Sequence, residues 1–155
     1  KIMKFLKLVA GRVAFWAGWP LWWLLLRKSI RTRVLLMHGN EALLVRGTLS
    51  SGRWTLPGGG VQGGEIPAEA ALREIKEELK LELSPKKLTP LGQMRAKGDN
   101  GLYFDCLLFA YELDTKTPMR ASLEIVEARW FKLDEIPVLP TQQLVRTALE
   151  LFMTK

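Results

Sequence analysis

The sequence places many carboxylates directly after a glycine-rich loop. Six acidic residues fall within residues 65–82, which follow the run LPGGG at residues 56–60. Glu77 and Glu78 follow Glu74 by three and four residues, so on a helix the three project from one side, and each like-charge pair at that spacing costs roughly 0.2–0.5 kcal/mol. A divalent cation would reverse this cost, because hard cations prefer carboxylate oxygens. The spacing therefore indicates a magnesium-type site, and a solvated acidic helix face is the alternative.

The same segment has the features of an amphipathic helix. Pro67 suits the first turn, where its missing N–H costs no hydrogen bond, and the alanine, leucine, glutamate and lysine residues that follow are strong helix formers. Leu72, Ile75 and Leu79 recur at helical spacing and predict one apolar stripe that faces a core. The sequence therefore predicts a helix over residues 67–80 that carries its carboxylates on one side.

The glycine run before this helix supports a phosphate site. Pro-Gly chemistry ends a strand and lets backbone N–H groups and carbonyls approach a ligand closely. A loop of this kind that leads into a carboxylate-bearing helix brings anion-accepting amides and a cation site together. The combination is typical of chemistry on phosphate groups.

The full pattern resembles a known family motif. Gly59, Glu65, the run REIKEE at residues 73–78 and Leu81 match the Nudix box G-x5-E-x7-R-E-U-x-E-E-x-G-U, in which U is aliphatic. A chance match to its polar and glycine positions should occur on the order of once in 10⁵ chains of this length. Lys80 departs from the motif, because the box has a glycine there. Such a glycine usually adopts the left-handed conformation, which costs an L-residue roughly 1–2 kcal/mol, so this helix must strain or end differently.

The resemblance to the Nudix family covers roughly residues 33–155 and carries expectations about fold and function. It implies an α+β fold, built as an α/β/α sandwich with a mixed sheet. It implies a hydrolase that uses Mg²⁺, or alternatively Mn²⁺, to cleave a pyrophosphate bond in a nucleoside diphosphate linked to another moiety. A catalytically silent Nudix-like nucleotide-binding module is the alternative. The complete carboxylate set favours the enzyme, because a silent module has no reason to retain glutamates that repel one another.

The resemblance also assigns roles by position. The expected cation ligands are the carboxylates of Glu74, Glu77 and Glu78 and the carbonyl of Gly58. Arg73 is expected to pair with Glu65 and so position the loop against the helix, and a contact between Arg73 and a phosphate is the alternative. The cation would neutralise the diphosphate, stabilise charge on the reacting oxygens and activate water.

The general base is left open by the sequence. In some relatives of the Nudix family, a Glu on the loop before the strand that here reads RWF assists the attacking water. Glu124, six residues ahead of Trp130, has that placement. Glu127 is the competitor, and proton transfer within the metal cluster alone is the third alternative. Candidate substrate contacts elsewhere are Arg46, Arg53 and Arg95 for phosphates and Tyr103 or Phe131 for a base, although strand packing or solvated charge is commoner for such residues.

Composition favours one domain in a reducing compartment. A chain of 155 residues suits a single domain with a sizeable core. Cys106 is the only cysteine and lies in an apolar run, so we expect it to pack in the core and expect a cytoplasmic protein. The net charge of +7 arises in residues 1–33, which contain eight basic and no acidic residues. Specific nucleic-acid binding by the nearly neutral remainder is therefore not expected.

Residues 1–28 are predicted to form a helical segment beside a Nudix domain at residues 29–155. Basic and apolar residues occupy different faces in its first half, which predicts an amphipathic helix. The apolar run at residues 13–26 holds four tryptophans but is shorter than the about 20 residues of a membrane span. Three alternatives stay open: docking on its own domain or in a homodimer, peripheral attachment to a membrane surface, and a true span.

Hydrophobic patterns elsewhere predict a mixed sheet between helices. Strands are expected near residues 31–38, 41–46, 54–56, 88–95, 102–112 and 128–132. A final amphipathic helix is expected over residues 141–153, after Pro140. Strands interleaved with few helices agree with the sandwich that the resemblance implies.

Overall fold

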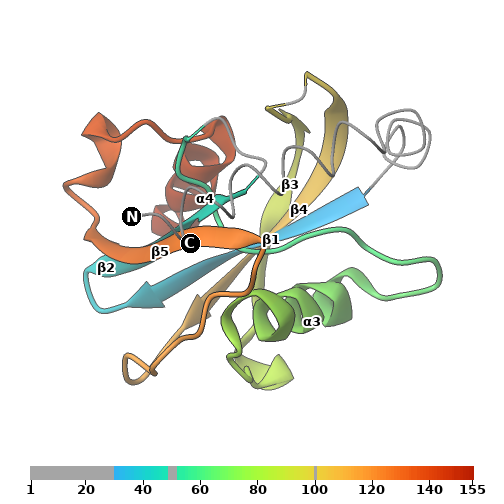
Figure 1. Cartoon of the computed structure of the whole chain (residues 1–155), viewed down its shortest axis with the longest axis horizontal. Coiled ribbons are helices and arrows are strands. Elements are labelled where there is room, and N and C mark those ends of the chain that lie inside the picture. The colour runs from blue at the N-terminus through green and yellow to red at the C-terminus, as the bar shows by residue number, and fades with distance from the viewer. Residues whose placement is uncertain (1–29, 49–51, 100) are drawn as a thin grey trace.

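Five strands form one mixed sheet, and a helix covers each of its faces (Figure 1). The computed structural model describes residues 30–48, 52–99 and 101–155, so the predictions for residues 1–28 lie outside the described residues. The elements are β1 (Ile30–His38), β2 (Glu41–Gly47), α3 (Pro67–Leu79), β3 (Thr89–Lys97), β4 (Tyr103–Glu112), β5 (Ile125–Lys132) and α4 (Gln143–Met153). Short 3-10 turns lie at Pro85–Lys87 and Ile136–Val138.

The strand order is β3-β4-β1-β2-β5, with β1 parallel to β4 and the other neighbours antiparallel. β1 and β2 form a hairpin, but their ladder is confined to the residues next to the turn, where Met37 pairs with Ala42. The first half of β1 is therefore left free on that side to pair with another segment. The mixed sheet and the two helices confirm the expected α+β fold.

The core divides into two apolar layers because successive side chains of a strand point to opposite faces. Val34 and Leu36 of β1 pack with Ile75 of α3 on one face. Leu35 and Met37 belong to the layer that contains α4 on the other face. Cys106 is fully buried in this second layer, which confirms its predicted place in the core.

Two local predictions are wrong. Residues 54–56 form no strand, because Thr55 bridges to Val45 while Trp54 bridges to Thr141, and a segment this short cannot form a ladder with both partners. The apolar stripe of α3 does not include Leu72, which is partly exposed. The stripe consists of Ala71, Ile75 and Leu79, which are four residues apart. The helix is therefore rotated slightly about its axis from the predicted orientation.

Candidate active site

The glycine loop is held by the free side of β1. Thr32 N–H donates to the Gly59 carbonyl at 2.8 Å, and Val34 N–H donates to the Pro57 carbonyl at 3.0 Å. Gly58 has a φ of +129°, and a Cβ there would lie 2.4 Å from the Thr32 carbonyl oxygen. Only glycine suits this position, because other residues would meet both backbone strain and a clash.

The loop also lies directly against the carboxylate helix. A Cβ at Gly59 would come within 2.4 Å of the Glu74 carboxylate. The absence of a side chain thus lets a charged group on α3 reach the loop backbone. This close approach gives a physical reason for the glycine that begins the motif.

Arg73 clamps the two elements together. Its Nε and Nη2 donate to the two carboxylate oxygens of Glu65 at 2.8 and 3.0 Å, and Nη2 also donates to the Gly60 carbonyl at 2.9 Å. Nη1 donates to Glu74 at 2.8 Å and more weakly to Glu77 at 3.4 Å. The hydrogen bond from Arg73 holds the pKa of Glu65 at about 2, and the same bond raises the pKa of Arg73. Arg73 therefore has the contacts of a residue that positions the loop.

Glu78 is the buried carboxylate of the cluster. Its residue exposure is 9%, and its Oε2 accepts a hydrogen bond from Gly58 N–H at 2.8 Å. Burial raises the pKa of Glu78 to about 7, and the negative charges of Glu74 and Glu124 add to the effect, whereas Arg33 and the Gly58 N–H oppose it. Burial and the neighbouring carboxylates thus both disfavour the ionised form of Glu78.

The loop before β5 is attached to the end of α3. Arg120 N–H donates to the Leu79 carbonyl at 3.0 Å, and Ser122 N–H donates to the Glu78 carbonyl at 2.8 Å. These bonds satisfy carbonyls that a helix end leaves without partners. Thr48 N–H holds the Glu124 carbonyl at 2.9 Å from the other side. The two attachments place Glu124 opposite the carboxylates of α3.

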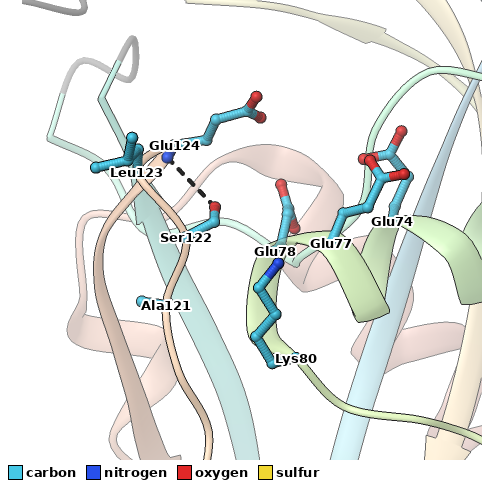
Figure 2. A pocket seen from close by; sticks show the side chains of 8 residues that line it. All are labelled: Glu74, Glu77, Glu78, Lys80, Ala121, Ser122, Leu123 and Glu124. Atoms are coloured by element: carbon cyan, nitrogen blue, oxygen red, sulfur yellow. Dashed lines mark hydrogen bonds between the residues drawn. The ribbon is translucent and has the colours of Figure 1, made fainter.

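The two elements enclose a cleft of about 490 Å³. Its lining residues are Glu74, Glu77, Glu78, Lys80, Ala121, Ser122, Leu123 and Glu124. Figure 2 shows the three glutamates of α3 on one side and the Ser122–Glu124 segment on the other. The predicted residues Glu74, Glu77, Glu78 and Glu124 thus share one cleft, with Gly58 hydrogen-bonded to one of them.

The cleft fits a hard divalent cation by its donor chemistry. In the residues that the structure describes, no group of three or more acidic, His or Cys side chains is already arranged to hold a metal ion. The side chains around the cleft nevertheless offer only oxygen donors of negative charge, apart from Lys80 and Ser122. Burial is the main cause of the raised pKa of Glu78 and repulsion from Glu74 and Glu124 adds to it, and a bound cation would offset both effects.

Other candidate residues do not line this cleft. Glu127 lies on β5, 3.8 Å from Arg46, whose guanidinium stacks over Trp54. Arg53 pairs with Asp99. The remaining candidates are Phe131, which is buried, and Arg95, which stacks over the ring of the exposed Tyr103. These side chains lie on the strands and loops of the domain, and their contacts there are consistent with packing and surface charge.

Lys80, which stands where the motif has a glycine, adopts a glycine-like backbone conformation at the end of α3. It caps α3 with φ 58° and ψ 31°, which is the left-handed conformation that glycine favours, and its N–H donates to the Lys76 carbonyl at 3.1 Å. The helix therefore ends as the motif expects, and the lysine carries the strain. Its side chain lines the cleft, which the motif alone does not indicate (Figure 2).

The sequence-based interpretation overlooked two arginines. Arg31 and Arg33 were grouped with the basic residues of the N-terminal segment, but both belong to β1 and lie beside the glycine loop. Arginine at alternate positions of an otherwise apolar strand was the available signal, because such residues share one face of a sheet.

The loop–helix unit packs on a mixed sheet through these contacts, and comparison with known proteins identifies the class of domain to which it belongs. The NUDIX domain model matches residues 27–152, so the chain belongs to the Nudix family. In the described part of the chain, no helix is long and apolar enough to cross a membrane.

Individual relatives share part of their length with this chain. The human 8-oxo-dGDP phosphatase NUDT18 is 31% identical over 117 residues, which are 72% of this chain and 35% of that protein. The NAD-capped RNA hydrolase NudC of Stutzerimonas stutzeri is 28% identical over 124 residues, 79% of this chain and 43% of that protein. The chain thus spans less than half the length of these relatives. The crystal structure of a MutT NUDIX hydrolase from Burkholderia pseudomallei superposes with a TM-score of 0.70 at 26% identity, over 79% of this chain and 96% of that one.

Proposed function

We propose that this protein is a divalent-cation-dependent hydrolase that cleaves a pyrophosphate bond in a nucleoside diphosphate linked to another moiety. One observation carries the proposal: four glutamates from two separate elements line a single cleft, and one of them, Glu78, is buried and crowded by like charge. Such an arrangement is costly for a fold unless a ligand compensates it. Chemistry on phosphates with a cation fits both the charge and the adjacent glycine loop.

The residues in and beside the cleft have different roles in the proposed reaction. Glu74, Glu77, Glu78 and the Gly58 carbonyl would hold Mg²⁺ or Mn²⁺, which when bound neutralises the diphosphate and activates water. Gly58 N–H orients the Glu78 carboxylate through its 2.8 Å hydrogen bond. Arg73 positions the loop by its contacts with Glu65 and Gly60, and it holds Glu74 beside the loop backbone.

Glu124 is our assignment for the general base. It lines the cleft opposite α3, and its backbone is fixed by Ser122 and Thr48. Glu127 points to a different neighbour, because it lies within 3.8 Å of Arg46 on the adjacent strand. A general base must lie within hydrogen-bond reach of the proton that it removes, and a place in the cleft is the first requirement for that.

The proposed substrate class draws support from the relatives. One is named for a nucleoside diphosphate and another for an NAD cap, and NAD contains a pyrophosphate between two nucleosides. Both names agree with a substrate in which a nucleotide is joined through phosphates. We therefore place the substrate among nucleotides and their derivatives.

A hydrolysis screen tests the proposal. Purified protein is incubated with nucleoside diphosphate derivatives and dinucleotides, with Mg²⁺, with Mn²⁺ or with EDTA, and products are resolved by chromatography. We expect cation-dependent cleavage of at least one phosphoanhydride substrate, and a loss of about 10²-fold or more in Glu78→Gln. Tight nucleotide binding without turnover under any of these conditions would instead support the silent binding module.

A further inference from the structure

Two arginines lie on the other flank of the glycine loop. Arg31 bridges to Gly60, and the Cα of Arg33 would lie 3.1 Å from a Cβ placed on Gly58. Both arginines are two residues apart on β1, so their side chains leave the same face of the sheet. That face is the one on which Leu35 packs towards α4. The pair of cations thus lies beside the loop that leads into the carboxylate helix.

Three guanidinium nitrogens of this pair are buried without acceptors among the described residues, although both arginines are only partly buried as residues. Arg31 Nε and Arg33 Nε and Nη1 are buried and have no hydrogen-bond partner in the part of the chain that the structure describes. Arg31 stacks over the Phe104 ring at 4.9 Å, which orients its planar group. Buried donors on a charged group are costly when no acceptor meets them. An anion would supply the acceptors that these nitrogens lack.

The charges of the pair are coupled to each other and to the cleft. Burial lowers the pKa of Arg31 to about 10, and repulsion from Arg33 adds to the effect, whereas Cys106 and, to a smaller extent, Glu74 oppose it. Arg33 in turn favours the ionised form of Glu78. The two arginines therefore belong to the same electrostatic unit as the carboxylates, although they do not line the cleft.

We propose that Arg31 and Arg33 form an anion subsite that binds a phosphate group of the substrate, next to the phosphate that is attacked in the cleft. The planar fork of a guanidinium matches phosphate oxygens in a bidentate manner, and two such groups on one strand face suit a doubly charged group. This inference rests on the proposed function for its place in the reaction. The binding of an anion to the pair is a separate property that needs no turnover.

Metal-free binding measures this property directly. The full chain, in EDTA, is titrated with ADP and with inorganic pyrophosphate by calorimetry, using wild type, Arg31→Gln and Arg33→Gln. We expect each variant to lose about tenfold or more in affinity for both probes, since hydrogen bonds to charged groups have this value. Arg129→Gln is the matched control, because Arg129 also stacks on a ring, Phe131, at 4.9 Å, but is exposed on β5.

A second test of the subsite uses only the wild-type protein, so its result does not depend on whether the variants fold. In ¹⁵N spectra, the Nε–H signals of Arg31 and Arg33 should shift as pyrophosphate is added, while that of Arg129 stays in place. Unchanged affinity in both glutamine variants, or static signals for both arginines, would overturn the subsite. A loss confined to ADP would also overturn it, because the site would then recognise the nucleoside.

The two proposals fail in different ways. If no phosphoanhydride is cleaved but pyrophosphate binding still depends on Arg31 and Arg33, the anion subsite stands and the hydrolase proposal falls. If turnover is observed and both arginine variants bind ADP and pyrophosphate as wild type does, the hydrolase stands and the subsite falls.

Discussion

Glu65 and Glu78 are the same residue type in one loop–helix unit, yet their environments are opposite. Glu65 accepts two hydrogen bonds from Arg73, and its pKa is about 2. Glu78 is buried, accepts one backbone hydrogen bond and faces like charges, and its pKa is about 7. The comparison separates two tasks: a carboxylate with a cation of its own fixes the structure, and a carboxylate without one is available to a ligand.

The largest expected difference between the two residues is in turnover. Glu78→Gln removes a proposed cation ligand, so kcat should fall by about 10²–10⁴-fold, and Glu77→Gln should behave similarly. Circular dichroism should show that the fold is intact, because the change removes charge from a buried group. Glu82→Gln is the control, since Glu82 is exposed and pairs with Lys76 outside the cleft. Wild-type kcat in Glu78→Gln would refute the assignment.

A smaller effect is expected from the opposite side of the cleft. Glu124→Gln should lower kcat about 10²-fold, because a positioned base contributes roughly that factor or more. Glu127→Gln should leave kcat unchanged, since Glu127 lies near Arg46 on β5. A larger loss in Glu127→Gln than in Glu124→Gln would reverse the assignment. Steady-state rates between pH 5 and pH 9 provide the test.

Glu65 and Glu78 should make the stability of the metal-free protein depend on pH in opposite directions. An unfolded Glu has a pKa of about 4.3. The lowered pKa of Glu65 stabilises the fold above that pH, and this contribution is lost as pH falls towards 2. The raised pKa of Glu78 means that the folded state binds more protons between about pH 4.3 and 7, so stability declines as pH rises through this window.

Urea unfolding in EDTA across pH 2.5–8 separates these contributions. Glu78→Gln should lack the decline towards neutral pH, and Glu65→Gln should lack part of the loss at acid pH. The same decline in Glu78→Gln as in wild type would show that another group causes it.

The smallest expected effect concerns the strained end of α3. Lys80→Gly should raise the free energy of unfolding by about 1 kcal/mol, because glycine adopts the left-handed conformation without a steric cost. Lys80→Ala should give no such gain, since it removes the side chain but keeps the Cβ. Equal stability of the two variants in urea denaturation would mean that the backbone at this position carries no strain.

Much of the fold and site was predictable because it rests on local patterns. The helix at α3 follows from Pro67 and the spacing of Ile75 and Leu79, and the shared side of its glutamates follows from helix geometry. The Arg73–Glu65 pair also agrees with the role expected from the motif. These features depend on residues close in sequence, so one segment contains the information.

The remaining features depend on contacts between distant segments. Glu124 faces α3 because the backbone N–H groups of Arg120 and Ser122 bond to carbonyls at the end of that helix. No local sequence pattern encodes these bonds. The place of Arg31 and Arg33 beside the loop depends on the short ladder between β1 and β2, which leaves room for residues 57–61 to pair with β1. The burial that raises the pKa of Glu78 likewise exists only in the assembled fold.

Binding of Mg²⁺ to wild type and to Glu78→Gln tests the central claim most directly. Calorimetric titrations at pH 7, in two buffers of different ionisation enthalpy, give both the affinity and the number of protons released. Because the pKa of Glu78 is about 7 without metal, wild type should release roughly half a proton per cation, and Glu78→Gln should bind more weakly and release none. Equal Mg²⁺ affinity and equal proton release in the two proteins would contradict the account.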